Sequence, residues 1–299
     1  MPIPARQLDG WTSLGATTIS SNAYNSIRTA LLAANSPLRG KSLDIFLQGS
    51  YANATNIRGD SDIDVVVLYD GTFVKDMTAL TLEQQRLHEA IFPLTTYPWQ
   101  SLHDDVLAAL RLHFRNNAVT PGRKAIKVRT GYGGMDADVV PAVQFRRYAT
   151  FVNQNNLTAH WGIQFFDSAN NPIVNYPKYH IANGEAKNNA TRTRGQYKST
   201  IRLFKNFRNY LVDHRLFADG VAPSYFVEGA LYNVPDHLFI GNYVDTVPAI
   251  LRYLLNTAYA GFLCQNAVVP LIGTGPTQWN ENNFATFLTA ANNAWINGI

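Results

Sequence analysis

Two aspartates stand at the start of a strongly β-branched segment, Asp62-Ile-Asp-Val-Val-Val-Leu68. β-branched residues favour strands, and because successive side chains of a strand point to opposite faces, Asp62 and Asp64 share one face. Two like charges at the end of a buried strand are costly unless they are paired or bind a metal ion. The segment therefore predicts an inner strand of a sheet that presents a pair of carboxylates at one end.

A glycine-serine pair precedes this strand. Gly49-Ser50 follows residues 43–48, whose alternating polarity is typical of a strand, and we predict a tight turn in which backbone N–H groups approach phosphate closely. Mg²⁺ is usually held by one or two carboxylates together with substrate phosphates. The turn and the aspartate pair together favour nucleotidyl transfer from a metal-bound nucleoside triphosphate. The alternative is an ordinary strand entered through the polar turn 58–61, in which Asp60 has a turn or capping role.

These residues carry a specific resemblance. The glycine-serine pair with Asp62-Ile-Asp64 resembles the signature of the polymerase-β-like nucleotidyltransferase superfamily. Within it, Gln48-Gly-Ser-Tyr51 and residues 55–64 are similar to the bacterial CD-NTases of clade E, the CdnE type, which are relatives of animal cyclic GMP-AMP synthase. Further matching segments, which extend the resemblance over nearly the whole chain, lie at residues 174–178, 186–188, 222–226 and 231–236.

Composition narrows the class of protein. The chain has 299 residues, 46% of them hydrophobic, so it can bury a substantial core, and its net charge of +4 is only mildly basic. The single cysteine, Cys264, excludes an intramolecular disulfide and a cysteine-built zinc thumb for DNA sensing. No His-X-X-X-His pair occurs, and we expect His88 to be a solvated or core residue. Without a secretory signal or an apolar run of about 18 residues, we expect a soluble, cytoplasmic protein that does not contact membranes.

The pattern of elements predicts an α/β (α+β) fold with a sheet-containing lobe packed on an α-helical C-terminal lobe. The resemblance implies that the first is a polymerase-β-like nucleotidyltransferase lobe with a mixed or antiparallel sheet. We place the catalytic core at residues 1–185 and the helical nucleotide-binding lobe at 186–299. In the core, helices are expected before residue 37, after a capping box at Thr81 and after Ser101, and strands at residues 43–48, 62–69, 124–129, 137–143, 161–166 and 173–176. In the lobe, helices are expected at 197–213, 224–234, 244–258 and 280–296.

A third carboxylate is expected, because two-metal phosphoryl transfer usually needs one beside the attacking hydroxyl. Asp138 opens the apolar run that continues to Pro141, as Asp62 opens its own, and it matches the third aspartate of the resembling family. Asp136 has the same parity but is expected to precede the strand. We therefore favour Asp62, Asp64 and Asp138 as ligands of two Mg²⁺ ions, while spacing alone leaves Asp136 open.

A basic face is predicted on the helix that begins at residue 197, where Lys198, Arg202 and Lys205 follow at i, i+4 and i+7 spacing. Spacing alone leaves a solvated face as the alternative. The resemblance implies that Lys205 contacts the donor triphosphate, that Ser224 contacts phosphate, and that Tyr225 stacks on the donor base. For Tyr225 a core position on an apolar helix is the alternative.

Asn175 is the candidate for base choice. On its predicted strand it shares a face with Ile173, where a polar amide needs a partner, and a carboxamide can pair bidentately with the edge of uracil. An asparagine satisfied by neighbouring backbone before Pro177 is the alternative. In the clade E enzymes, the resemblance implies, an asparagine in this Asn-Tyr-Pro-Lys context accompanies uridine use.

The resemblance thus implies a cyclic dinucleotide synthase that consumes ribonucleoside triphosphates, ATP and UTP, and serves antiphage (CBASS) defence by activating a separate effector protein. Cyclic UMP-AMP is the leading expected product and cyclic di-UMP the next. The same core motif would serve an enzyme that adds nucleotides to RNA or tRNA. A catalytically silent nucleotide-sensing module is a further alternative, against which the intact aspartate pair argues.

Overall fold

The computed structural model describes residues 3–15, 17–59, 62–92 and 97–297, and the chain divides into two compact units. The helical unit consists of Met1–Ala16, Gly49–Asp60 and Lys178–Ile299. The sheet unit consists of Thr17–Gln48 and Ser61–Pro177. The domain boundary between residues 185 and 186 stays a prediction. Asp60 lies outside the described residues, as does its expected turn or capping role.

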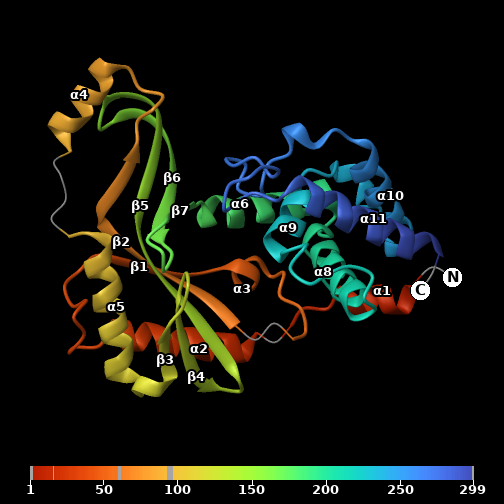
Figure 1. Cartoon of the computed structure of the whole chain (residues 1–299), viewed down its shortest axis with the longest axis horizontal. Helices are drawn as coiled ribbons and strands as arrows, with labels where there is room; N and C mark the ends of the chain where they lie inside the picture. Colours follow the sequence, from red (N-terminus) through yellow and green to blue (C-terminus); the bar gives the residue numbers. More distant parts are fainter. Residues whose placement is uncertain (1–2, 16, 60–61, 93–96, 298–299) are drawn as a thin grey trace. The chain divides into compact units, whose positions relative to one another are not determined.

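Seven strands form one mixed sheet in the sheet unit (Figure 1). Their order is β1-β2-β5-β4-β3, and β6 pairs with both β5 and β7. The β2–β5 pairing is parallel and the other described pairings of the sheet are antiparallel. The strands are β1 (Leu43–Gln48), β2 (Asp62–Asp76), β3 (Val119–Pro121), β4 (Ile126–Tyr132), β5 (Met135–Asn153), β6 (Asn156–Phe166) and β7 (Pro172–Asn175).

The central strands β2 and β5 are buried on both faces, because helices cover one face and an apolar cluster fills the other. Helices α2 (Thr18–Leu31) and α5 (Trp99–His113) pack against each other and against the sheet (Figure 1). The opposite face carries a cluster of Val66, Leu68, Val140, Ala142, Ile163, Phe165 and Ile173. By strand parity this cluster lies on the same face as Asp62 and Asp64. The carboxylates therefore stand at the edge of a dry surface.

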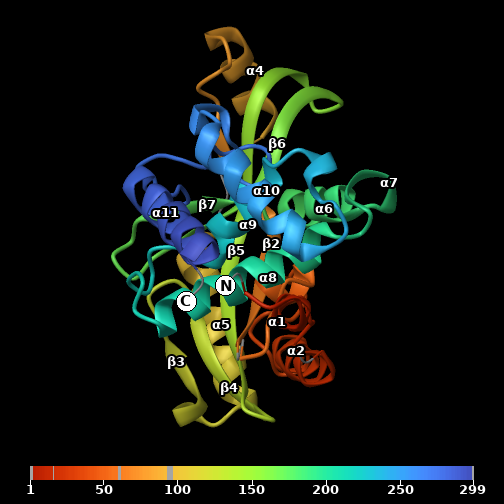
Figure 2. The same cartoon turned by 90° about the vertical axis from the view of Figure 1, so that its right-hand side faces the viewer.

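The ribbon of β5 and β6 extends well beyond the strands expected at residues 137–143 and 161–166 (Figure 2). The extension is stabilised by stacking of an arginine on aromatic rings of other strands. The order of residues along β5 does not show this contact. The Arg146 guanidinium lies 3.8 Å from the ring centre of Phe73 and 4.4 Å from that of Trp161. Helix α4 (Leu82–Ile91), which starts with the predicted capping box at Thr81, packs on this ribbon.

His88 on α4 is fully buried among aromatic rings, as expected for a core histidine. Its ring lies 4.7 Å from Tyr148 and 4.9 Å from Phe151. Burial lowers the pKa of His88, and the charges of Lys75 and Arg146 lower it further. The imidazole is therefore held neutral as part of the packing.

The helical unit is built on one core to which the four predicted C-terminal helices contribute. Those helices match α8 (Tyr197–Asp213), α9 (Ser224–Tyr232), α10 (Tyr243–Asn256) and α11 (Glu281–Asn297). The unit also contains α1 (Ala5–Trp11), α3 (Gly49–Asn53), α7 (Ala190–Thr193) and most of α6 (Pro177–Asn188). Among the described residues no helix is long and apolar enough to cross a membrane.

Two of these helices differ from the expectations. Gly49-Ser50 does not form a simple turn but begins α3, with Gly49 at a φ of +67° that favours glycine. Helix α6 was not predicted, because its residues show no apolar stripe and Gly184 lies inside it. A Cβ atom at Gly184 would stand 2.4 Å from Gln265 Nε2, so a tertiary contact selects this glycine.

Candidate active site

The aspartates meet at one end of the parallel strand pair β2–β5. Asp62 is directly opposite Asp136, and Asp64 is directly opposite Asp138. All four residues have the same parity, so their side chains leave the same face of the sheet. Asp136 was expected to precede the strand, and this prediction is wrong: it is the second residue of β5. The third carboxylate therefore has two candidates on neighbouring positions of one strand.

The surroundings of Asp138 favour its protonated form. Its pKa is raised, first because burial penalises the charged form. Lys127, the residue opposite it on β4, lowers the pKa, whereas the charges of Asp62 and Asp136 raise it. A carboxylate held among other carboxylates binds a proton or a cation more readily than an isolated one. These surroundings suit a bound cation, and the choice of Asp138 as the third aspartate stays a prediction.

The donor set fits Mg²⁺, which prefers carboxylate oxygens and leaves several positions for water and substrate phosphates. Across the described residues, no three acidic, histidine or cysteine side chains form a ready-made metal-binding group. A complete protein cage is not required, since Mg²⁺ usually takes one or two carboxylates and completes its shell with phosphate oxygens. Asp62 and Asp64 supply such a pair.

Gln48, the residue that precedes the glycine-serine motif in the chain, is paired with Asp64 on β2. In the helical unit, the side-chain amide of Asn53 donates to the Gly49 carbonyl at 2.7 Å. The Thr55 amide donates to the Ser50 carbonyl at 2.9 Å. Both ends of α3 are thereby fixed, and its shape is set before any phosphate binds.

The basic residues of α8 do not form a solvated face. Lys205 is 1% exposed and donates from Nζ to the Thr55 carbonyl at 2.9 Å. Lys198 is buried and forms an ion pair with Glu185. Arg202 donates to two backbone carbonyls of the helical unit. All three cations make contacts within the helical unit. Lys205 directly contacts Thr55, which lies in the segment that follows α3.

Ser224 and Tyr225 form the first turn of α9. Arg208 Nη1 donates to the Ser224 hydroxyl at 3.1 Å, which places a cation beside the residue expected to contact phosphate. The Tyr225 ring packs against the core and stacks on His180, with ring centres 5.2 Å apart and planes at 20°. Burial is the main cause of its strongly raised pKa. The phenol is therefore neutral and half-buried.

Asn175 ends β7 and shares a face with Ile173, as predicted, and it is half-buried. Its side-chain oxygen accepts a hydrogen bond from the Tyr176 amide at 2.8 Å, which is the local arrangement that the alternative describes. Within the described part of the chain, no hydrogen bond is found for its side-chain nitrogen. Asn175 therefore retains a donor after its local bond is made.

One functional candidate escaped the sequence analysis. Glu228 is a lone acid in the otherwise apolar helix α9, and this isolation was the available signal. It is 3% exposed and bonded to Thr55 and His180, which are remote in sequence. Only the fold brings these residues together.

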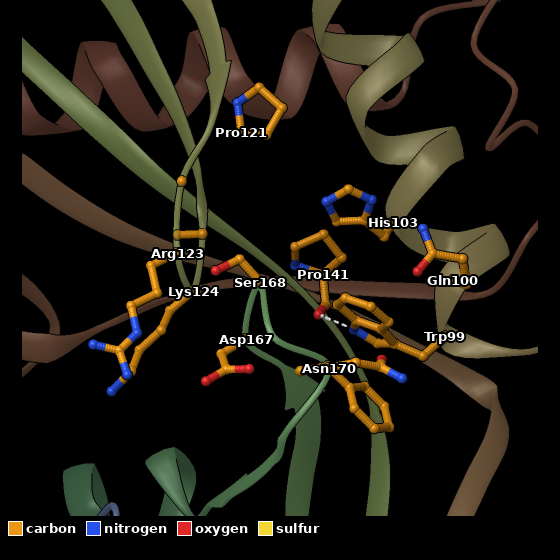
Figure 3. A pocket seen from close by; sticks show the side chains of 13 residues that line it. Trp99, Gln100, His103, Pro121, Arg123, Lys124, Pro141, Asp167, Ser168 and Asn170 are labelled. Carbon is orange, nitrogen blue, oxygen red and sulfur yellow. Dashed lines mark hydrogen bonds between the residues drawn. The ribbon is translucent and has the colours of Figure 1, made fainter.

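A separate hollow of about 350 Å³ opens in the sheet unit, where β5 passes from pairing with β4 to pairing with β6 (Figure 3). Trp99 donates from Nε1 to the Pro141 carbonyl at 2.8 Å and lies beside Phe166. In Figure 3, Arg123 and Lys124 extend away from the Trp99 ring. None of the predicted site residues lines this hollow, so it is not part of the candidate active site.

Known proteins provide the remaining test. Residues 182–296 match the family described as the cGAS/DncV-like nucleotidyltransferase C-terminal helical domain, and residues 28–118 match the nucleotidyltransferase domain. A cyclic UMP-AMP synthase of Rhodothermus marinus is 40% identical over 99% of this chain and 98% of its own length. The cyclic nucleotide synthase CdnE01 of Staphylococcus haemolyticus is 38% identical over 99% of each chain.

The solved structure of the Rhodothermus marinus CdnE c-UMP-AMP synthase with Apcpp and Upnpp matches with a TM-score of 0.89 at 39% identity, covering 99% of this chain and 98% of that one. The predicted fold class and enzyme class are confirmed. The CdnE cyclic dinucleotide synthase of Elizabethkingia meningoseptica, at 29% identity and a TM-score of 0.76 over 97% of this chain and 98% of that one, was solved with GTP and Apcpp. The chain belongs to the bacterial CD-NTase family of nucleotidyltransferases and, within it, to the CdnE type of cyclic nucleotide synthase.

Proposed function

We propose that this enzyme is a Mg²⁺-dependent synthase that joins ATP and UTP into cyclic UMP-AMP, with cyclic di-UMP as the next product in order of preference. The observation that carries the proposal is the register of β2 and β5, which sets Asp62 opposite Asp136 and Asp64 opposite Asp138. Carboxylates at one end of a parallel strand pair are suited to hold metal-bound triphosphate.

In this mechanism Asp62, Asp64 and Asp138 would hold two Mg²⁺ ions. The ions would supply positive charge that neutralises the triphosphate and lowers the pKa of the acceptor ribose hydroxyl. Gly49 and Ser50 fix the position of the donor phosphates. Asp138, whose pKa is already raised, is suited to accept the hydroxyl proton.

The acceptor oxygen then attacks the donor α-phosphorus in line, a new P–O bond forms, and the bond to pyrophosphate breaks. Lys205 and Ser224 add charge and a hydrogen bond to the phosphates, and Tyr225 stacks on the donor base. Stacking supplies affinity without selecting a base. A second round within the linear dinucleotide closes the ring and releases a second pyrophosphate.

Base choice falls to Asn175 in this proposal. Its side-chain nitrogen has no hydrogen bond within the described residues, and its oxygen makes one local bond at the end of β7. A rotated carboxamide presents a donor and an acceptor, which match the adjacent carbonyl and imino N–H of uracil. The likeness to a relative named as a cyclic UMP-AMP synthase supports the same choice.

We place the reaction in the bacterial cytoplasm, as one step of antiphage (CBASS) signalling. The product is a small diffusible anion, so its natural use is to bind and activate a separate effector protein. This role rests on the resemblance to the CdnE type and not on the geometry of the site.

Incubation of the purified protein with all four ribonucleoside triphosphates and Mg²⁺, followed by mass spectrometry, tests the proposal. We expect a cyclic product that contains uridine and adenosine, together with pyrophosphate, and no product when the metal is chelated. A parallel reaction with an added RNA oligonucleotide distinguishes the tailing activity. Extension of that oligonucleotide, or a product without uridine, would overturn the proposal.

A further inference from the structure

The helical unit contains a buried carboxylate whose two oxygens are both engaged. Glu228 is 3% exposed, in the middle of α9. Thr55 Oγ1 donates to its Oε1 at 2.7 Å, and His180 Nε2 lies 2.8 Å from its Oε2. An acid buried this deeply is costly unless it is paired and hydrogen-bonded, so both contacts are needed to keep Glu228 in place.

The surroundings of Glu228 favour its ionised form. Burial alone would raise its pKa, but the hydrogen bond from His180, the charge of Lys205 and the Thr55 hydroxyl lower it, and the net shift is downward. Lys205 Nζ lies at the Thr55 carbonyl, 2.9 Å away, and so belongs to the same cluster. We name Thr55, His180, Lys205 and Glu228 the Glu228 cluster.

One side of the cluster leads to α3. The Thr55 amide donates to the Ser50 carbonyl at 2.9 Å, so the residue that binds Glu228 also closes the helix of the glycine-serine motif. A second connection runs through Gln265, whose Nε2 donates to the His180 carbonyl at 2.8 Å and to Asn53 Oδ1 at 3.4 Å. The first connection ends on Ser50, the second residue of α3, and the second ends on Asn53, its last residue.

The other side leads to Tyr225. The His180 ring that binds Glu228 is stacked on the Tyr225 ring, with centres 5.2 Å apart. Tyr225 lies three residues before Glu228 on α9, so both side chains leave the same side of the helix. Asn266 fixes the far end of the ring by donating to the phenol oxygen at 3.0 Å.

The His180 ring has one orientation in this arrangement. Its Nδ1 atom is buried and has no hydrogen-bond partner within the described residues, so a proton there would be unsatisfied. The tautomer that satisfies the contacts carries its proton on Nε2 and donates it to Glu228. A glutamine at this position has a single acceptor oxygen, so it cannot accept from both the Thr55 hydroxyl and His180.

We propose that Glu228 is a positioning residue for nucleotide binding, which holds α3 through Thr55 and the Tyr225 ring through His180. A single buried acid thereby fixes the expected phosphate cradle and the expected base platform at the same time. The inference rests on the roles proposed above for Gly49, Ser50 and Tyr225. It adds the residue that orients them, which touches neither substrate nor metal.

The test compares Glu228→Gln with Asp236→Asn, a matched change of a paired acid to its amide in the same unit. Asp236 binds Lys187 and Arg192 and lies outside the Glu228 cluster. We expect Glu228→Gln to weaken binding of a non-hydrolysable ATP analogue and to raise KM for triphosphate by about tenfold, with kcat within about threefold of wild type. Asp236→Asn should leave both quantities unchanged.

A second pair of variants guards against misfolding. Thr55→Val removes the hydroxyl that Glu228 accepts from, whereas Thr55→Ser keeps it, so only the valine variant should raise KM. A purely structural role predicts the opposite pattern: a lower Tm for Glu228→Gln with unchanged analogue binding and KM, which would overturn the inference. If the wild-type protein makes no cyclic product, the proposed function fails, and the analogue-binding comparison still decides whether Glu228 positions a nucleotide.

Discussion

The chain surrounds its acidic side chains in opposite ways at two sites. At the end of the β2–β5 pair, aspartates face aspartates in register, and the pKa of Asp138 is raised. In the helical unit, the single acid Glu228 is surrounded by donors, and its pKa is lowered. At Asp138 burial and the neighbouring aspartates outweigh the charge of Lys127, whereas at Glu228 hydrogen-bond donors and the charge of Lys205 outweigh burial.

The difference indicates that the aspartate cluster is suited to bind a ligand, whereas Glu228 is suited to hold neighbouring groups in place. A cluster of like charges is unfavourable in the protein alone, and a divalent cation relieves it, so such a cluster is poised to bind. A carboxylate with all of its partners supplied by the fold gains nothing from an added ligand, and its effect is to keep neighbouring groups rigid. The same residue chemistry thus has different consequences at the two sites.

The largest effect is expected at the aspartate cluster. Asp62→Asn and Asp64→Asn each remove a metal ligand and a negative charge, so product formation should fall by roughly a thousandfold or more, several kcal/mol of transition-state stabilisation. The melting temperature should stay the same or rise, because repulsion is relieved. Pyrophosphate release and a circular-dichroism melt measure the two quantities. Near-normal turnover by either variant would remove these residues from the site.

The second-largest effect is expected at Asn175, which belongs to neither group of acids and is proposed to select the base. Asn175→Ser removes one bidentate contact and should shift incorporation from UTP toward ATP by about 1–3 kcal/mol, roughly 5- to 150-fold, by analogy with groove readout. Competition assays with both triphosphates measure the ratio. An unchanged ratio would show that the local bond to the Tyr176 amide is the whole role of Asn175.

A smaller effect is expected for the cation of the Glu228 cluster. Lys205→Ala should raise KM for triphosphate by about tenfold and change kcat little, because a lysine supplies a point charge to phosphate without entering the bond-making step. Lys198→Ala is the control on the same helix, since Lys198 pairs with Glu185. A fall in kcat with KM unchanged would contradict the phosphate-positioning role of Lys205.

The smallest effect is a difference in the pH dependence of stability, and it has opposite signs at the two sites. The lowered pKa of Glu228 gives stability that is present above the ordinary value of 4.5 and is lost as pH falls through the folded value. The raised pKa of Asp138 gives stability that is present below 3.8 and is lost as pH rises through the folded value.

Urea denaturation at several pH values measures this contrast. The stability deficit of Glu228→Gln relative to wild type should shrink as pH falls below 4.5, whereas Asp138→Asn should gain on wild type as pH rises above 3.8. If the two differences move in the same direction with pH, the comparison between the sites is wrong.

Much of the fold could be predicted because its signals are local. The capping box at Thr81 and the stripes of α8 to α11 each lie within one element, and they place those helices within a few residues. The ribbon of β5 and β6 was underestimated because its stability comes from Arg146 stacking across strands. Helix α6 escaped prediction because Gly184 is selected by Gln265, a residue far along the chain.

The sequence alone determined the strand that carries Asp62 and Asp64, and with it their common face, because strand periodicity is a property of the local backbone. Tertiary structure alone decided that Asp64 faces Asp138 and that Lys205 is buried at Thr55. It also decided that Glu228 meets a threonine 173 positions away. Register and burial depend on which distant segments pack together, and no spacing within one segment records that choice.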